Sequence, residues 1–265
     1  MTLCLVNLCG WRIKKTALYR LRLHSGLEYD LELSSCWVLD AVWGMMSIRA
    51  KICGLTRVTD VQAAVASGVD AIGLVFYAPS PRAVSVPQAI ELVQHVGPFV
   101  QVVGLFVNAS LADVAQVLAQ VPLDLLQFHG DESPEDCALI AKVTGRRFIK
   151  AIQMKPDLDV LAEITRYRAA GASGILLDAW HPDLKGGTGH AFDWQSWPTS
   201  DVPLILAGGL TPDNVRDAIA TTQPYAVDVS GGVEQMDVTS GKPLKGVKDS
   251  QLMQRFMAGV HDGQG

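Results

Sequence analysis

The chain has 265 residues, of which 49% are hydrophobic, 18% are charged and 7% are aromatic. An average globular chain has roughly 25% charged residues, so this composition predicts a large apolar interior and excludes a mainly disordered chain. The net charge of −5, from 22 basic and 27 acidic residues, lacks the basic excess that a general nucleic-acid binder carries.

Neither a membrane span nor a disulfide framework is expected. No segment reaches the roughly 18 uninterrupted apolar residues that a membrane helix needs. The apolar first ten residues precede the nearby basic residues, which is the wrong order for a secretory signal. The five cysteines are odd in number and have no CxxC spacing, which disfavours both disulfides and a structural zinc site. We therefore expect a cytoplasmic protein without a membrane partner.

Residues 1–46 differ from the rest of the chain. They hold three of the five cysteines and three of the six tryptophans, and no clear helical or strand period runs through them. We interpret them as an extension outside the barrel, with translation starting at Met45 or Met46 and residues 47–265 forming the domain. The alternative is a small accessory segment packed on that domain. Mass spectrometry of the native N-terminus decides, because an intact Met1 peptide would contradict the later start.

From residue 48 onward, short apolar runs rich in β-branched residues alternate with amphipathic stretches. The predicted strands are Ile48–Cys53, Ala71–Phe76, Phe99–Phe106, Leu123–Phe128, Arg147–Ile152, Gly174–Leu177, Val202–Ala207 and Ala226–Ser230. The predicted helices are Thr59–Ser67, Val86–His95, Ser110–Gln120, Ser133–Val143, Leu158–Ala170, Thr211–Thr221 and Lys245–Val260, with a glycine-rich loop and a short turn near Phe192–Trp197 after the sixth strand.

This alternation predicts a closed (βα)8 barrel, the TIM-barrel architecture, from eight βα units in about 220 residues. Ser133 and Thr211 each offer an N-cap hydroxyl followed by proline and acidic residues. Continuous apolar runs are typical of parallel strands that are buried on both faces. The alternative is an open doubly wound sheet, which usually carries a GxGxxG turn after its first strand. The segment Cys53–Thr56 has no such turn.

Barrel enzymes place their chemistry at the C-terminal ends of the strands, so the residues there are the candidates. Cys53 ends the first strand, where a thiol is either a buried inert side chain or a reactive thiolate. Lys51 is not expected to activate it. Asp178 ends the apolar run Ile175–Leu177, where a carboxylate is costly unless it is hydrogen-bonded or functional. Arg82, after the second strand, is either a surface charge or a bidentate clamp for a carboxylate.

Glycine pairs follow the last two predicted strands, Gly208-Gly209 and Gly231-Gly232. Without Cβ atoms, backbone N–H groups approach a phosphate closely, and barrels often build a phosphate site from these two loops. The alternative is that the glycines only serve tight turns. Two pairs at these two strands favour an anion site, and hence a phosphorylated small molecule as the partner.

Other chemistries find less support in the sequence. His129 near Asp131 and Glu132 lacks the converging partners of a metal site, so no metal is expected. Ser230 lacks both a GxSxG elbow and a nearby base, which disfavours a hydrolase.

Seven short motifs, in order across residues 48 to about 257, resemble those of the phosphoribosylanthranilate isomerases of tryptophan biosynthesis. They are Lys51–Thr56, Ser80–Arg82, Gln127–Gly130, Leu177–Asp178, Gly186–Gly189, Leu206–Leu210 and Asp228–Glu234. The resemblance implies an Amadori rearrangement of N-(5-phosphoribosyl)anthranilate to 1-(2-carboxyphenylamino)-1-deoxyribulose 5-phosphate. It makes Asp178 the general acid and Cys53 the general base, which no metal or redox cofactor needs to assist.

The resemblance also implies how the substrate is held. Arg82 would bind the anthranilate carboxylate. The other substrate-binding residues would be Gly187, Gly208, Gly209, Ser230, Gly231 and Gly232. Cys53 must act as a thiolate, which a lowered pKa would favour.

Two alternative functions belong to other classes. Another phosphosugar barrel, an indole-glycerol-phosphate synthase or a pentose-phosphate epimerase, would need a catalytic lysine or a metal-binding histidine pair. Neither Lys51 nor Lys150 lies in the synthase pattern. A non-catalytic phosphate-binding barrel would keep the glycines but have no use for both Cys53 and Asp178. The sequence leaves monomer and homodimer open.

Overall fold

The structure, a computed structural model, describes residues 16–22, 28–34, 47–179, 194 and 197–263. The chain divides into two units, Met1–Ser47 and Ile48–Gly265. In the first unit, β1 (Thr16–Arg22) and β2 (Glu28–Ser34) pair in an antiparallel two-stranded sheet. The interpretation that residues 1–46 have no strand period was therefore wrong. In β2, apolar and polar residues alternate strictly, which is a strand signal that the sequence analysis missed.

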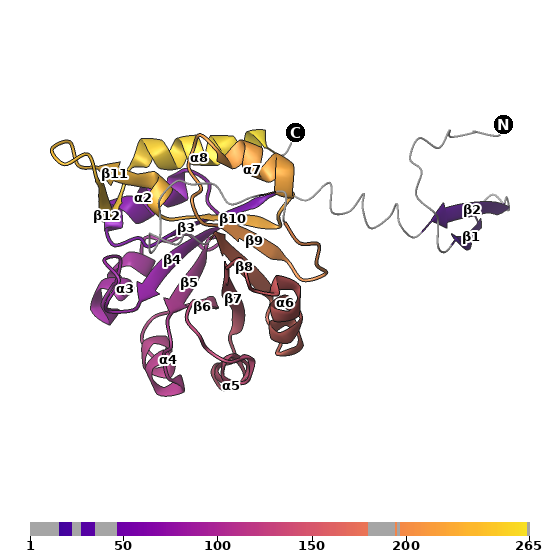
Figure 1. The fold of residues 1–265 in the computed structure, drawn as a ribbon, viewed down its shortest axis with the longest axis horizontal. Coiled ribbons are helices and arrows are strands. Elements are labelled where there is room, and N and C mark those ends of the chain that lie inside the picture. The colour runs from indigo at the N-terminus through magenta and orange to yellow at the C-terminus, as the bar shows by residue number, and fades with distance from the viewer. Residues whose placement is uncertain (1–15, 23–27, 35–46, 180–193, 195–196, 264–265) are drawn as a thin grey trace. The chain divides into compact units, whose positions relative to one another are not determined.

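The second unit is built on a closed barrel of eight strands in the order β10-β3-β4-β5-β6-β7-β8-β9 (Figure 1). All neighbouring pairs are parallel. The barrel strands are β3 (Arg49–Cys53), β4 (Ala71–Phe76), β5 (Gln101–Phe106), β6 (Leu125–Phe128), β7 (Arg147–Met154), β8 (Gly174–Ala179), β9 (Leu204–Ala207) and β10 (Ala226–Val229). This confirms the predicted (βα)8 barrel.

Helices surround the strands in Figure 1. They are α2 (Val58–Ala66), α3 (Val86–Val93), α4 (Leu111–Leu118), α5 (Pro134–Thr144), α6 (Val160–Ala169), α7 (Val215–Thr222) and α8 (Ser250–Asp262). Ser133 caps α5, because its side chain accepts the N–H of Asp136, as predicted. None of the described helices combines the length and the apolar character that crossing a bilayer requires.

The last predicted helix begins at the wrong residue. Instead of a helix from Lys245, β12 (Pro243–Lys248) pairs with β11 (Glu234–Met236) in an antiparallel hairpin. Gly246 in β12 has a φ of +85°, which a helix does not allow. Helix α8 begins only at Ser250. Asp249 is its N-cap, because the Asp249 side chain accepts backbone N–H groups of the first helical turn.

Helix α7 also begins later than predicted, at Val215 instead of Thr211. Residues 211–214 form a turn, in which Thr211 N donates to Asn214 Oδ1 at 2.8 Å. The Asn214 side chain donates in turn to Gly209 O at 2.9 Å. Thr211 is therefore not the N-cap of α7, and Asn214 instead fixes the loop that follows β9.

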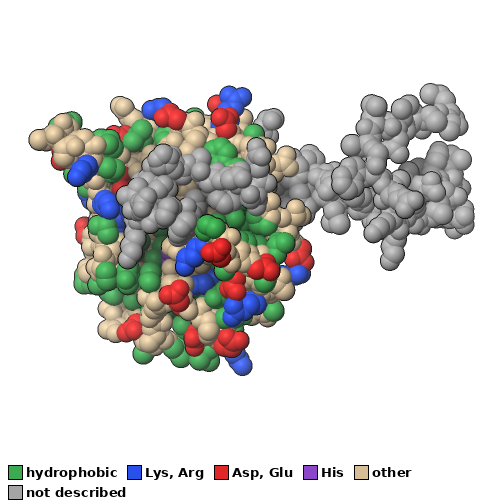
Figure 2. Space-filling view, viewed as in Figure 1, with side chains coloured by type: hydrophobic (Ala, Val, Ile, Leu, Met, Phe, Trp, Pro, Cys, Tyr) green, Lys and Arg blue, Asp and Glu red, His purple; other side chains and the backbone are tan. Residues whose placement is uncertain are grey.

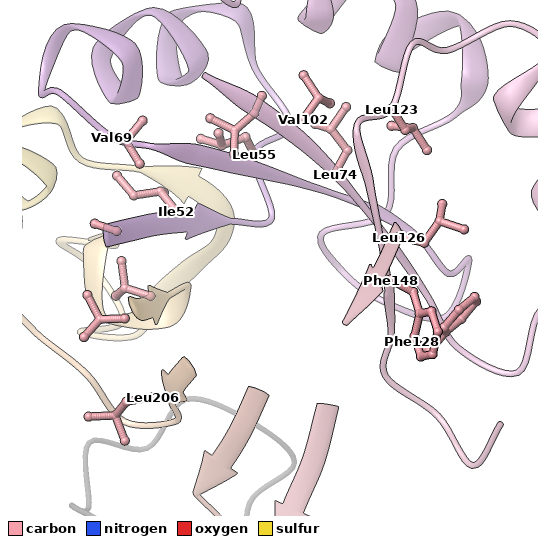
Figure 3. Close-up of a cluster of buried hydrophobic side chains, with 14 of the residues drawn as sticks. Ile52, Leu55, Val69, Leu74, Val102, Leu123, Leu126, Phe128, Phe148 and Leu206 are labelled. Atoms are coloured by element: carbon pink, nitrogen blue, oxygen red, sulfur yellow. The ribbon is translucent and has the colours of Figure 1, made fainter. Parts of the chain in front are cut away.

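Side chains alternate between two sides of the barrel wall. Those between strands and helices form the main hydrophobic core, which includes Ile52, Leu74, Phe128 and Leu206 (Figure 3). The adjacent positions face the barrel interior and form smaller clusters, one of Cys53, Val75 and Leu105 and one of Ala151, Leu176 and Ala207. On the face shown in Figure 2, basic and acidic side chains are interspersed rather than gathered into one basic patch.

Candidate active site

Cys53 and Asp178 lie at the C-terminal ends of β3 and β8. Each directly follows an outward-facing core residue, Ile52 before Cys53 and Leu177 before Asp178. Because successive side chains on a strand point to opposite faces, both side chains lie on the inner side of the barrel wall. The Cys53 side chain is buried, whereas that of Asp178 is 25% exposed. The two predicted catalytic residues therefore occupy the same end and the same side of the barrel.

Asp178 contacts a histidine that the sequence analysis gave no role. His129 Nε2 lies 3.4 Å from Asp178 Oδ2, and His129 Nδ1 lies 2.9 Å from Gln127 Nε2. Because the Gln127 amide donates to Nδ1, we assign the ring proton to Nε2, the nitrogen that faces the Asp178 carboxylate. Gln127 is buried at the end of β6, and its Oε1 accepts no hydrogen bond within the described part of the chain.

A buried ion pair lies beside Cys53. Lys51 Nζ donates to Asp228 Oδ1 at 2.9 Å, and the two side chains are only 7% and 8% exposed. Their residues are register partners on the neighbouring parallel strands β3 and β10. The sequence analysis did not expect Lys51 to activate the thiol. Residues two apart on a strand share a face, however, and the Lys51 ammonium group interacts with Cys53.

The charges around Cys53 act in opposite directions. Burial raises the pKa of the Cys53 thiol most, Lys51 and Lys248 lower it, and Asp228 raises it, so that the net shift is upward. The sequence analysis stated that a lowered pKa would favour the thiolate, but in the protein without substrate the burial of Cys53 outweighs the effect of the two lysines. Asp228 also interacts with His129 and Asp178. Asp228 lies on β10, which is between β9 and β3 in the barrel order.

Arg82 lies next to Cys53 but already has a carboxylate partner. A Cβ on Gly54, which has a φ of +75°, would lie 2.5 Å from Arg82 Cδ, so the arginine packs directly on the residue after Cys53. Its Nε and Nη2 donate to Glu234 Oε1 and Oε2 at 2.6 and 2.9 Å. Burial raises the pKa of Glu234, but Arg82 and Lys248 more than offset it, so the net shift is downward.

The two glycine loops approach each other closely. Gly208 and Gly209 have φ angles of +84° and +66°, which favour glycine. A Cβ on Gly232, in the turn Gly231–Val233, would lie 1.8 Å from Leu210 O. The loops after β9 and β10 are therefore in backbone contact, as a shared anion site requires.

The structure also gives Ser230 specific partners. Its Oγ donates to Cys53 O at 3.1 Å, and its carbonyl oxygen accepts from Lys248 Nζ at 2.9 Å. Ser230 thus joins the loop after β10 to the end of β3. Gly187, the remaining predicted binding residue, lies outside the described residues.

The residues that could suggest a metal have other partners. His129 contacts Asp178, whereas Glu132 Oε2 binds Lys150 Nζ at 2.7 Å in a second buried ion pair. Lys150 also donates to Gly130 O at 2.5 Å. Glu132 and Lys150 therefore fix the loop that carries His129. Within residues 47–179, 194 and 197–263, no group of His, Cys, Asp and Glu side chains is arranged to hold a metal ion.

Comparisons with known proteins agree with this geometry. Residues 50–258 match the family described as N-(5'phosphoribosyl)anthranilate (PRA) isomerase. A protein named N-(5'-phosphoribosyl)anthranilate isomerase, from Acinetobacter calcoaceticus, is 62% identical over 218 residues, which are 82% of this chain and 99% of that protein.

Solved structures agree as well. Phosphoribosyl anthranilate isomerase from Thermotoga maritima superposes with a TM-score of 0.70 at 38% identity, over 80% of this chain and 98% of that one. A phosphoribosyl anthranilate isomerase solved in complex with reduced 1-(o-carboxyphenylamino)-1-deoxyribulose 5-phosphate gives a TM-score of 0.65 at 34% identity, with the same coverage. The chain belongs to the phosphoribosylanthranilate isomerase family.

Proposed function

We propose that the chain converts N-(5-phosphoribosyl)anthranilate to 1-(2-carboxyphenylamino)-1-deoxyribulose 5-phosphate by general acid–base catalysis. The observation that supports it most is the pair of Cys53 and Asp178 on the inner side of one barrel end, with Asp228 between them. The related structure with a reduced 5-phosphate compound bound supports the same class of substrate.

The reaction needs one acid and one base. Asp178 protonates the ring oxygen as the furanose opens to a Schiff base between C1 and the anthranilate nitrogen. The Cys53 thiolate then removes the proton from C2, and the electrons of that C–H bond form the enolamine, which tautomerises to the ketone. The Asp178 carboxyl group, whose Oδ2 faces His129 Nε2 at 3.4 Å, carries the proton that is donated.

The substrate is held at both ends. Backbone N–H groups of the contacting loops, with Gly208, Gly209, Gly231 and Gly232, would bind the phosphate, and Gly187 and Ser230 would complete this end. Anchoring both ends places the reacting carbons between the acid and the base.

Arg82 would bind the anthranilate carboxylate through the donors that Glu234 leaves free. We expect Arg82→Ala to raise KM about 10- to 100-fold with a smaller change in kcat, since a hydrogen bond to a charged group contributes about 1.5–3 kcal/mol. Steady-state kinetics measure both constants, and thermal unfolding checks that the fold survives. A normal KM with a strongly reduced kcat would contradict this role.

We propose that residues 47–265 form the isomerase domain and that residues 1–46 lie outside the barrel. The family match over residues 50–258 supports this division. Cytoplasmic localisation is supported by the two described cysteines, Cys53 and Cys137, which are both free thiols. The protein would be a monomer or a homodimer, and light scattering would distinguish the two. In either state it would bind one phosphorylated substrate per barrel.

Turnover of phosphoribosylanthranilate tests the proposed function. We expect the full chain and a chain begun at Met46 to have equal kcat/KM, and both to rescue a tryptophan auxotroph. No turnover by either chain would refute the isomerase. Activity of the full chain alone would refute the division at residue 46.

A further inference from the structure

Lys51 and Cys53 share a space that the neighbouring strand leaves open. Gly73 is the register partner of Cys53 on β4. A Cβ on Gly73 would lie 2.6 Å from Cys53 Sγ and 3.1 Å from Lys51 Cε. Because no side chain fills this position, the lysine stem runs past the thiol on the inner side of the barrel wall.

The position of the lysine ammonium group is fixed by Asp228. The pair is buried on both sides, and its 2.9 Å hydrogen bond uses only one of the three ammonium hydrogens. A buried ammonium group next to a thiol stabilises the thiolate, whereas a carboxylate at similar distance destabilises it. Both effects reach Cys53 here.

We propose that Lys51, oriented by Asp228, is a positioning residue that stabilises the Cys53 thiolate for removal of the C2 proton. This inference rests on the proposed function, in which Cys53 is the base. Lys51 itself does not touch the reacting carbon. Asp228 has two opposing effects, because it fixes the lysine and also repels the thiolate.

Several other charged groups face this part of the barrel. Lys248 of β12, fully buried, interacts with Cys53 and lies 3.3 Å from Glu234 Oε1. His129, which directly follows β6, and Asp178 of β8 act on Asp228. These groups stay in place when Lys51 or Asp228 is changed, so a difference between the two variants reports the missing charge itself.

The test measures thiol reactivity independently of turnover. The purified full chain is alkylated with iodoacetamide over a range of pH, and mass spectrometry follows the peptide that contains Cys53. Since only the thiolate reacts, the pH midpoint of the rate reports how readily the thiol ionises. We expect Lys51→Met to raise this midpoint by about one pH unit or more, and Asp228→Asn to lower it.

A double variant keeps the test valid if a single variant, left with an unpaired buried charge, fails to fold. Lys51→Met with Asp228→Asn removes both charges, and its midpoint should lie between those of Lys51→Met and the wild type, because the lysine has the larger effect on Cys53. The matched control is Lys150→Met, which breaks another buried ion pair, on β7. It should leave the midpoint unchanged.

A purely structural role for Lys51 predicts no opposite shifts. Equal midpoints in Lys51→Met, the double variant and the wild type would overturn the inference, as would a shift in Lys150→Met as large as that in Lys51→Met. Turnover by Cys53→Ala separates the two proposals. If this variant is inactive while the midpoints do not move, the inference fails and the isomerase assignment stands. If it is fully active, the base assignment fails.

Discussion

Cys53→Ala and Asp178→Asn are each expected to lower kcat about a hundredfold or more, at the lower end of what general acid–base groups contribute. Alanine has no group that accepts the C2 proton. Asparagine keeps the shape of the side chain beside His129 but does not supply the acidic proton for ring opening. Both changes preserve the local shape, so KM should change less than kcat.

The matched control for the thiol is Cys137→Ala. Cys137 is also a buried free cysteine, but it lies in α5, on the outer side of the barrel. Its pKa is raised to about 12, chiefly by burial, so it remains a thiol at neutral pH. We expect wild-type kcat from this variant. Wild-type kcat from Cys53→Ala, at an unchanged melting temperature, would show that another group removes the proton.

The strand-end rule predicted Cys53 and Asp178 because it needs only the end of an apolar run, which is a local feature of the sequence. Lys51 and Asp228 gave no such local signal. They pair across 177 residues of sequence. Burial of a charged side chain within an apolar strand is expected to be unfavourable unless its partner is known. The available signal was the two-residue spacing from Lys51 to Cys53, which places both on one face.

Arg82 shows the same limit. Its loop position suggested bidentate recognition of a carboxylate, which for a substrate stays a prediction. In the structure the guanidinium is bidentate on Glu234, 152 residues later. The segment that supplies Lys248 was predicted as part of a helix from Lys245 to Val260. A hairpin forms there instead, because β12 pairs with β11 and Lys248 lies against Glu234. Local propensity does not encode either of these contacts.

Substitution of Gly232 should disrupt the proposed phosphate site. The added methyl of Gly232→Ala would lie 1.8 Å from Leu210 O, 2.9 Å from Leu210 C and 3.1 Å from Thr211 Cα. All three are backbone atoms, so no side-chain rotation relieves the overlap. The loops after β9 and β10 must separate, which breaks up the site formed by their N–H groups.

We expect Gly232→Ala to raise KM at least about tenfold, the effect of losing roughly 1.4 kcal/mol of binding, and to reduce the free energy of unfolding by about 1–3 kcal/mol through overpacking. Urea denaturation and steady-state kinetics measure the two effects. Gly97→Ala is the matched control, because a methyl there meets no atom within 4 Å. It should change stability by no more than about 0.5 kcal/mol. Wild-type KM and stability in Gly232→Ala would mean that the two loops do not need to touch, and the phosphate would then have to be bound by side chains rather than by backbone N–H groups.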